Sequence, residues 1–132
     1  MKQMAYTTAT KEAEILATGV YENFKYYVVS YGTHPCAYVD VSNTSLANTD
    51  YHEIDIECHG GLTYSRDYLS AVDTERVNGK WYIGWDYAHF GDYTFYPYVG
   101  EEWEKRWTTE EIVAECKNVI NQIVDEEGVQ DD

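Results

Sequence analysis

Three side chains that can bind a cation or exchange a proton alternate along IDIECH (54–59): Asp55, Glu57 and His59. Successive side chains of a β-strand point to opposite faces. A strand here would therefore present all three on one face and the apolar residues between them on the other. Carboxylate and imidazole groups that share a face suit coordination of a divalent ion, hydrogen bonding to a ligand, or general acid–base catalysis.

A second group, Asp86, His89 and Asp92, lies in GWDYAHFGD (84–92) among large aromatic rings. A metal-dependent hydrolase that uses carboxylates and histidines of both groups is one hypothesis. Spacing is its only support, and polar residues on the water-facing side of an antiparallel strand are the commoner explanation. The sequence has no GxSxG motif for a nucleophile. We therefore assign no catalytic residue, no metal ligand and no cofactor, and expect a binding protein rather than an enzyme.

Between these groups, Gly60-Gly61 is followed by Thr63, Ser65 and Arg66. Paired glycines permit a tight turn whose amides can cradle an anion, and two hydroxyls with a guanidinium suit phosphate oxygens. A simple turn is the more common reason for adjacent glycines. Neither GxxxxGK[ST] nor GxGxxG is present, so the stretch is not one of the standard nucleotide-binding loops.

Aromatic residues surround the second polar group. On a strand, Trp81, Ile83, Trp85 and Tyr87 would share a face, and the first three suit packing against a helix. Tyr87 and Phe90 stand where the strand gives way to a loop, which suits stacking on a planar ring. The residues that we expect to bind a ligand are His59, Gly60, Gly61, Thr63, Ser65, Arg66, Trp85, Asp86, Tyr87, His89, Phe90 and Asp92.

Several local patterns predict the elements that must position these residues. Helix formers over 7–18 predict a short N-terminal helix that Gly19 would end. Aromatic and β-branched residues in FKYYVVSY (24–31) and CAYVDV (36–41) predict two strands joined as a hairpin. Further extended segments are predicted over 54–58, 62–69 and 80–88.

The clearest pattern lies near the C-terminus. Thr108 and Glu111 form a T-x-x-E capping box, and apolar residues recur at helical spacing through 109–125. The apolar stripe of this helix needs a sheet face to pack on. The predicted fold is α+β: an antiparallel sheet of about five or six strands, with N- and C-terminal helices on one face. We expect a single domain over 1–127 and an acidic tail over 128–132.

The chain of 132 residues carries a formal net charge of −15, and 11 acidic against 3 basic residues lie from Gly100 onward. This charge repels polyanions, so direct binding to nucleic acid or to an anionic membrane surface is not expected. The 3 cysteines include no CxxC pair and are interpreted as reduced thiols. The sequence opens without a signal-peptide pattern, which predicts a cytoplasmic protein.

Four blocks of the chain resemble a group of small uncharacterised proteins encoded by phages and by prophages of Firmicutes. The blocks are HPCAYVDV (34–41), IDIECHGGLTYS (54–65), KWYIGWDYAHFGDY (80–93) and WTTEEIVAECKNVINQI (107–123), and HGGLTYS and GWDYAHFGD are the most specific parts. The resemblance implies a phage-linked protein of the bacterial host cytoplasm that counters host defence. Small phage proteins of that kind include sponges for nucleotide signals, such as Thoeris anti-defence proteins, and inhibitors of CRISPR effectors.

The leading hypothesis is a non-enzymatic protein that binds and sequesters a small nucleotide-like molecule. The alternative is an acidic, anti-CRISPR-like inhibitor that imitates nucleic acid and occupies a basic surface of a host defence protein. The metal-dependent hydrolase is the second alternative. Exposed sheet edges and many aromatic residues also predict a homodimer or higher homo-oligomer.

Overall fold

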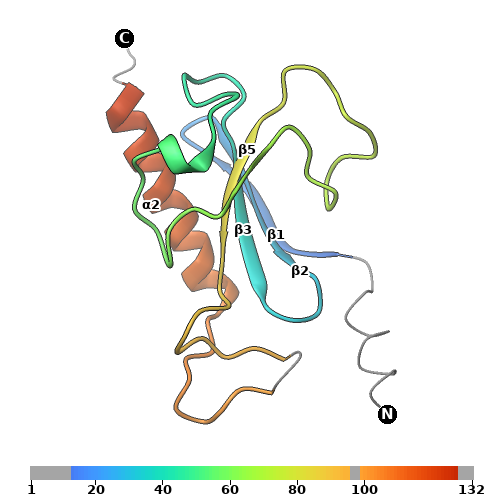
Figure 1. The fold of residues 1–132 in the computed structure, drawn as a ribbon, viewed down its shortest axis with the longest axis vertical. Coiled ribbons are helices and arrows are strands. Elements are labelled where there is room, and N and C mark those ends of the chain that lie inside the picture. Colours follow the sequence, from blue (N-terminus) through green and yellow to red (C-terminus); the bar gives the residue numbers. More distant parts are fainter. Residues whose placement is uncertain (1–12, 96–98, 128–132) are drawn as a thin grey trace.

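The fold is an antiparallel sheet with one long α-helix across one face (Figure 1). The structure is a computed structural model that describes residues 13–95 and 99–127. In spatial order the strands are β1 (Glu14–Tyr21), β2 (Phe24–Ser30), β3 (Pro35–Asp40), β5 (Tyr82–Asp86) and β4 (Tyr64–Arg66). The helix is α2 (Thr109–Glu127). The predicted antiparallel sheet of about five or six strands has five, and the prediction of a C-terminal helix on one face is confirmed.

The predicted hairpin of β2 and β3 is also confirmed, with Ser30 opposite Pro35 at its closed end. Strand β5 lies between β3 and β4, so both of its edges are hydrogen-bonded. This central position explains why its first four residues are all buried. Pairing on both edges fixes the C-terminal end of β5. It therefore also fixes the start of the loop that carries His89 and Asp92.

The predicted N-terminal helix is wrong over residues 14–18, which belong to strand β1; residues 7–12 lie outside the described part of the chain. A tight turn at Glu22-Asn23, with φ of 51° and 70°, pairs β1 with β2. This pairing outweighs the modest helix propensity of the segment. Gly19 ends no helix: a Cβ there would lie 2.5 Å from the Tyr26 hydroxyl oxygen, so the glycine makes room for that ring.

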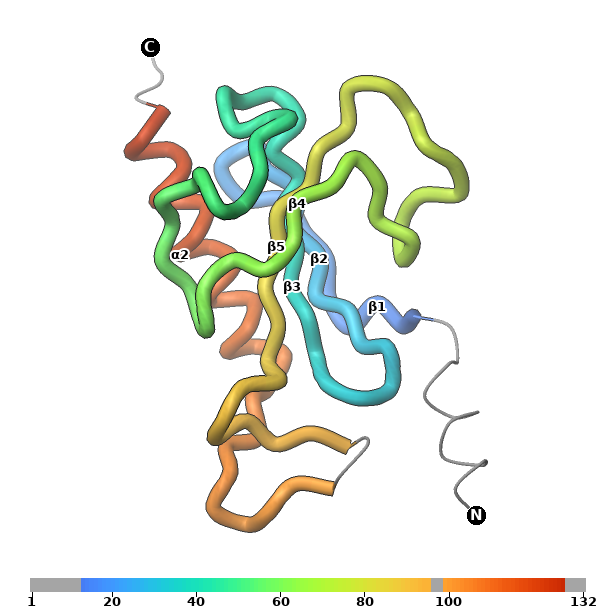
Figure 2. The backbone as a smooth tube through the Cα atoms, viewed as in Figure 1, coloured from blue at the N-terminus to red at the C-terminus, as the bar shows by residue number. Residues whose placement is uncertain are grey.

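The predicted strand over 54–58 is wrong, although its alternation of apolar and polar residues is real. Ile54, Ile56 and Cys58 pack against the core while Asp55 and Glu57 are exposed. The segment has no strand partner and runs beside α2 (Figure 2). The Gln122 side chain accepts a hydrogen bond from the Glu57 N–H (2.9 Å) and donates one to the Glu57 carbonyl (2.7 Å). The Gln122 side chain of α2 therefore makes the two backbone hydrogen bonds at Glu57 that a neighbouring strand would otherwise supply.

The predicted capping box begins α2. Thr108 N–H donates to Glu111 Oε1 (2.9 Å), and Glu111 N–H donates to Thr108 Oγ1 (3.1 Å). The buried face of the helix packs with the inner face of the sheet in one apolar cluster. The helix residues in this core are Ile112, Cys116, Val119, Ile120 and Ile123.

The opposite face of the sheet carries a second, smaller apolar cluster rich in tyrosine. Tyr27, Tyr38 and Tyr82 pack there with Leu69, which the loop after β4 lays over the sheet. The Tyr64 ring meets the Tyr38 ring edge-on at 5.0 Å. This cluster packs the short strand β4 against β5, and with its partly buried neighbours it holds 5 of the 14 tyrosines.

Candidate functional site

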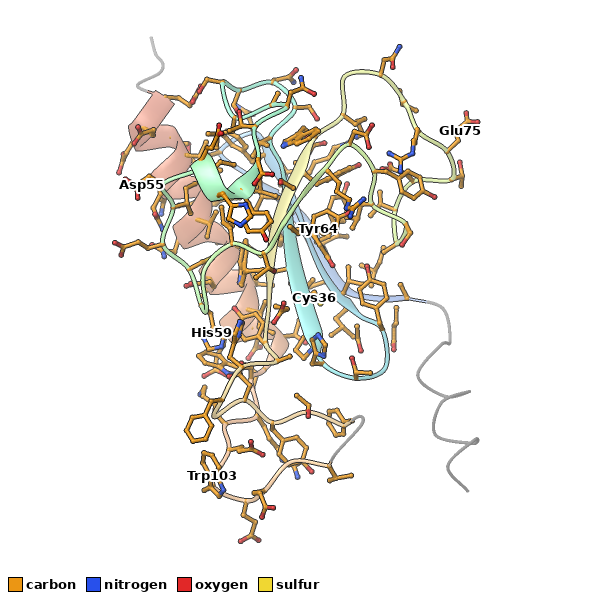
Figure 3. All side chains as sticks on the ribbon, viewed as in Figure 1. Cys36, Asp55, His59, Tyr64, Glu75 and Trp103 are labelled. Atoms are coloured by element: carbon orange, nitrogen blue, oxygen red, sulfur yellow. The ribbon has the colours of Figure 1, made fainter. Side chains whose placement is uncertain are left out.

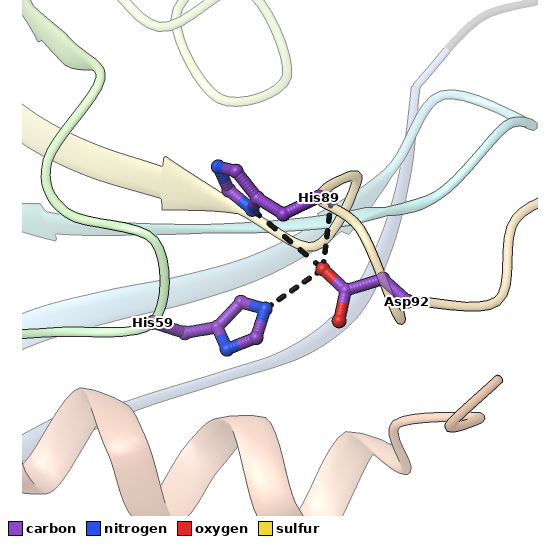
Figure 4. A group of neighbouring side chains, drawn as sticks. All are labelled: His59, His89 and Asp92. Carbon is purple, nitrogen blue, oxygen red and sulfur yellow. Dashed lines mark hydrogen bonds and ion pairs between the residues drawn. The ribbon is translucent and has the colours of Figure 1, made fainter.

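Two segments that are distant in sequence meet beyond the end of β5 (Figure 4). The turn at 58–61 brings His59, and the segment after β5 brings His89 and Asp92. His59 Nε2 lies 2.7 Å from Asp92 Oδ2. The sequence placed these three residues in the expected ligand-binding set, and the structure brings them together.

Asp92 is the centre of this cluster, and it is only 5% exposed. Its Oδ2 faces His59 Nε2 and accepts a hydrogen bond from the His89 N–H (2.9 Å), while its Oδ1 accepts one from Trp107 Nε1 (2.8 Å). Burial raises the pKa of the Asp92 carboxyl, but the hydrogen bonds from His59, His89 and Trp107 outweigh burial and hold the pKa below its usual value. Asp92 is thus an ionised carboxylate in a nearly dry setting.

The His89 ring lies between two carboxylates, within ion-pair distance of both but without a hydrogen bond to either. Its Nδ1 is 3.6 Å from Asp92 Oδ2 and 3.7 Å from Asp86 Oδ1, and within the described residues this buried nitrogen has no hydrogen-bond partner. The ring sits against Gly60, where a Cβ would lie 2.5 Å from His89 Nε2. Gly60 therefore contributes by having no side chain.

Aromatic rings enclose the His59 imidazole. Tyr87 stacks on it with ring centroids 4.6 Å apart and an interplanar angle of 7°. Trp107 meets it edge-on at 4.9 Å. Tyr87 and its neighbour Trp85 are each 1% exposed, and Trp85 Nε1 donates to the Tyr87 hydroxyl (3.1 Å). These two predicted ligand contacts thus lie within the core, where Tyr87 supports a histidine.

Sequence reasoning missed two members of this neighbourhood. Trp107 immediately precedes the Thr108 cap and packs against the same core as Ile112, an arrangement that resembles a hydrophobic staple and could have been read from the capping box. His34 lies close enough to interact electrostatically with Asp86, His89 and Asp92. Burial, aided by His89, lowers the pKa of His34 despite the raising effect of both carboxylates.

Three other predicted residues line a different place, a hollow of about 630 Å³ beside β4. They are Thr63, Ser65 and Arg66. The remaining lining residues are Asp50, Tyr51, Tyr64, Asp67 and Trp81. Thr63 also connects this hollow with the histidine cluster, because its hydroxyl donates to Asp86 Oδ2 (3.3 Å). The predicted set therefore divides between two adjoining regions.

The charged groups around this hollow differ in how they are engaged. Asp50 accepts hydrogen bonds from His52, and Asp67 pairs with Arg76. Arg66 pairs with Tyr82 through the backbone of β4, but its exposed guanidinium has neither a hydrogen bond nor an ion-pair partner among the described residues. In a chain of net charge −15, a guanidinium without a carboxylate partner is available to an outside anion.

The last two predicted residues lie at the edges of these regions. Gly61 adopts φ +83° with open space where a Cβ would stand, so it serves the turn alone. Phe90 is 95% exposed, and its ring lies 5.4 Å from that of Trp103. Figure 3 shows Trp103 on the loop that projects below the sheet, and it places Asp55 beside α2, well away from His59. Asp55 is therefore not part of the histidine cluster.

Within the described residues, His59, His89 and Asp92 form a group that could hold a metal ion, since one ligand atom from each lies within 4.8 Å of the others. The thiols do not join this group. Burial raises the pKa of Cys36 to about 11, and burial together with Glu115 raises the pKa of Cys58 and of Cys116 to about 12.

Comparisons with protein-family models, with curated proteins and with solved structures give no match for this chain. Among the described residues, no helix combines the length and the apolar character that crossing a bilayer requires.

Proposed function

We propose that this chain is a phage-linked anti-defence protein of the bacterial cytoplasm that binds and sequesters a small nucleotide-like molecule without catalysis. The observation that carries the binding proposal is the exposed Arg66, free of an acidic partner among the described residues, in a hollow lined by rings and hydroxyls. The phage link and the anti-defence role rest on the resemblance of HGGLTYS and GWDYAHFGD.

The lining of the hollow matches the parts of a nucleotide. Guanidinium groups bind phosphate oxygens through paired hydrogen bonds. Trp81 and Tyr51 offer partly buried rings for a base to stack on. Ser65 Oγ already accepts the Tyr51 N–H (3.0 Å), which leaves its own proton free to donate. The volume of about 630 Å³ falls within the range of small-molecule sites.

A larger hollow of about 940 Å³ between the β1–β2 turn and the end of α2 suits such a ligand less well. Its lining includes Glu22, Asp40 and Glu127, and its Lys80 is paired with Asp40 at 3.2 Å. Three carboxylates there face two lysines, Lys25 and the already paired Lys80. Beside β4, by contrast, the two lining carboxylates Asp50 and Asp67 are engaged by His52 and Arg76, so they repel a phosphate less. We therefore place the ligand beside β4.

The first test is native mass spectrometry of the chain purified from bacterial cytoplasm, followed by calorimetric titration with a panel of mono-, di- and cyclic nucleotides. We expect one panel member to bind, and Arg66→Ala to weaken its affinity at least about tenfold through loss of a charged hydrogen bond. Arg106→Ala is the matched control, because Arg106 stacks on Tyr93 in a different loop. Absence of binding across the panel, or equal losses in both variants, would contradict the proposal.

The second candidate is the acidic inhibitor of a host defence protein. It is favoured by the exposed carboxylates of α2 and of the segment beside it, such as Glu110, Glu126, Asp55 and Glu57. We expect binding to a basic partner to weaken with salt and with neutralisation of these carboxylates. Equal inhibition of the defence complex by a variant with amides at these positions would exclude this candidate.

Two exposed apolar regions could form the interface of the proposed homo-oligomer. Val20 on edge strand β1 is 65% exposed, and Phe90 and Trp103 form an exposed pair beyond β5. Size-exclusion chromatography with light scattering should show more than one chain per particle, and Phe90→Ser or Val20→Lys should reduce the mass of the particle. A monomer at micromolar concentration would contradict this part of the proposal.

A further inference from the structure

The geometry points to a binding site for one divalent transition-metal ion, with Zn²⁺ as the best match, formed by His59, His89 and Asp92. This inference goes beyond the proposed function, because it concerns other residues and another class of ligand. It also replaces the ligand set that spacing suggested, since Asp92 and not Asp55 lies with the histidines (Figure 4).

The donor set determines which ion suits the site. Two imidazole nitrogens and one carboxylate oxygen are typical zinc ligands, and three protein ligands leave a fourth position open. An oxygen-preferring ion such as Mg²⁺ or Ca²⁺ would favour more carboxylates and carbonyls. No cysteine belongs to the group of ligand atoms. The site therefore fits zinc better than the common alkaline-earth ions.

The distances require only small movements. Tetrahedral zinc with bonds of about 2.0 to 2.1 Å places its ligand atoms about 3.3 Å apart. Asp92 Oδ2 is 3.6 Å from His89 Nδ1 and 2.7 Å from His59 Nε2, and one ligand atom from each residue lies within 4.8 Å of the others. Ion binding would open the short pair by about half an ångström and draw the two nitrogens together. The proton on His59 Nε2 would leave to solvent.

Two features of the surroundings favour an ion over a purely structural contact. His89 Nδ1 is a buried nitrogen without a hydrogen-bond partner among the described residues, and buried polar atoms are rarely left in that state. Asp92 is held by Trp107 Nε1 on Oδ1 and by the His89 N–H on Oδ2, which fixes the direction of the carboxylate. Such outer contacts commonly orient the ligands of metal sites.

The competing explanation is that Asp92 only joins the 59–61 turn to the loop after β5. In that case His59 and His89 would stabilise the fold without taking up an ion. The two explanations differ in stoichiometric metal binding, which a structural cluster does not produce.

The test uses the full chain after dialysis against a chelator. Calorimetric titration with Zn²⁺ and native mass spectrometry should give one ion per chain, and Co²⁺ should give the visible absorption of a tetrahedral site. His89→Ala should weaken Zn²⁺ binding at least about tenfold, and the more conservative His89→Gln should do the same if the alanine variant folds poorly. His52→Ala is the matched control, because His52 is exposed and pairs with Asp50 on η1 (Tyr51–Glu53).

Two results would overturn the inference: no stoichiometric Zn²⁺ binding by the wild-type chain, or Zn²⁺ binding by the His89 variants as tight as that of wild type. Failure here is distinguishable from failure of the proposed function. Arg66→Ala should leave Zn²⁺ binding unchanged, and His89→Gln should leave nucleotide binding unchanged.

Discussion

His59 Nε2 lies 2.7 Å from Asp92 Oδ2 across 33 positions of sequence, with Asp92 almost fully buried. This contact joins the turn that follows the segment beside α2 to the loop that follows strand β5. The Trp107 indole and the His89 N–H also donate to the Asp92 carboxylate, so three separate parts of the chain meet at one ionised group. The stability of the whole corner should therefore depend on its negative charge.

Asp92→Asn should lower the free energy of unfolding by about 2 to 4 kcal/mol. In the wild type His59, the His89 N–H and Trp107 all donate to a charged carboxylate, whereas in the variant an amide N–H group would face one or more of these donors. Chemical denaturation followed by fluorescence measures this. The control, Asp125→Asn, changes an exposed carboxylate of α2 and should stay within about 0.5 kcal/mol of wild type. Equal stability of the two variants would show that the Asp92 charge stabilises nothing.

Gly60 and Gly61 form a matched pair for a second prediction. Both have positive φ, of 70° and 83°, so alanine at either position incurs a backbone cost of about 1 to 2 kcal/mol. A Cβ at Gly60 also collides with the His89 ring, whereas one at Gly61 meets nothing within 4 Å. Gly60→Ala should therefore be the more destabilising and should shift the imidazole NMR signals of His89. Similar losses and unchanged His89 signals in both variants would contradict the placement of that ring.

Local signals in the sequence were sufficient for α2 and for the β2–β3 hairpin. The capping box and the helical spacing of apolar residues refer to neighbours within one or two turns, and no distant contact opposes them. Strand β1 could not be predicted in this way. Its residues favour a helix when only local propensity is considered. The turn at Glu22-Asn23 and the pairing with β2 instead make the segment a strand.

The grouping of the candidate site was predictable only in part. His59, His89 and Asp92 were expected to act together, and they meet. Alternation alone also tied Asp55 and Glu57 to His59, yet the chain reverses at 58–61 and leaves both carboxylates beside α2. Trp107 comes from a third segment, and nothing in its local sequence indicates contact with Asp92.

The cysteines should be chemically inert in the folded chain. Burial, with a contribution from Glu115, raises the pKa of Cys58 from 9.0 to about 12, which leaves about a thousandfold less thiolate at pH 8. Iodoacetamide labelling at pH 8, read by mass spectrometry, should be slow in native protein and fast at all three thiols in denaturant. Rapid labelling of a native thiol would mean that its surroundings open readily or that its pKa is not raised.

The Gln122 amide should control local opening of the segment beside α2. Gln122→Leu removes both hydrogen bonds to the Glu57 backbone, and Glu57 is exposed, so water can replace them at a cost of about 1 to 2 kcal/mol. Hydrogen exchange over 54–58 should then become about five- to thirtyfold faster, because the Glu57 N–H loses its protein acceptor. Asn121→Leu makes a similar change on the exposed side of the same helix and should leave this exchange unaltered. If both variants exchange alike over 54–58, apolar packing of Ile54, Ile56 and Cys58 holds the segment in place without help from the amide.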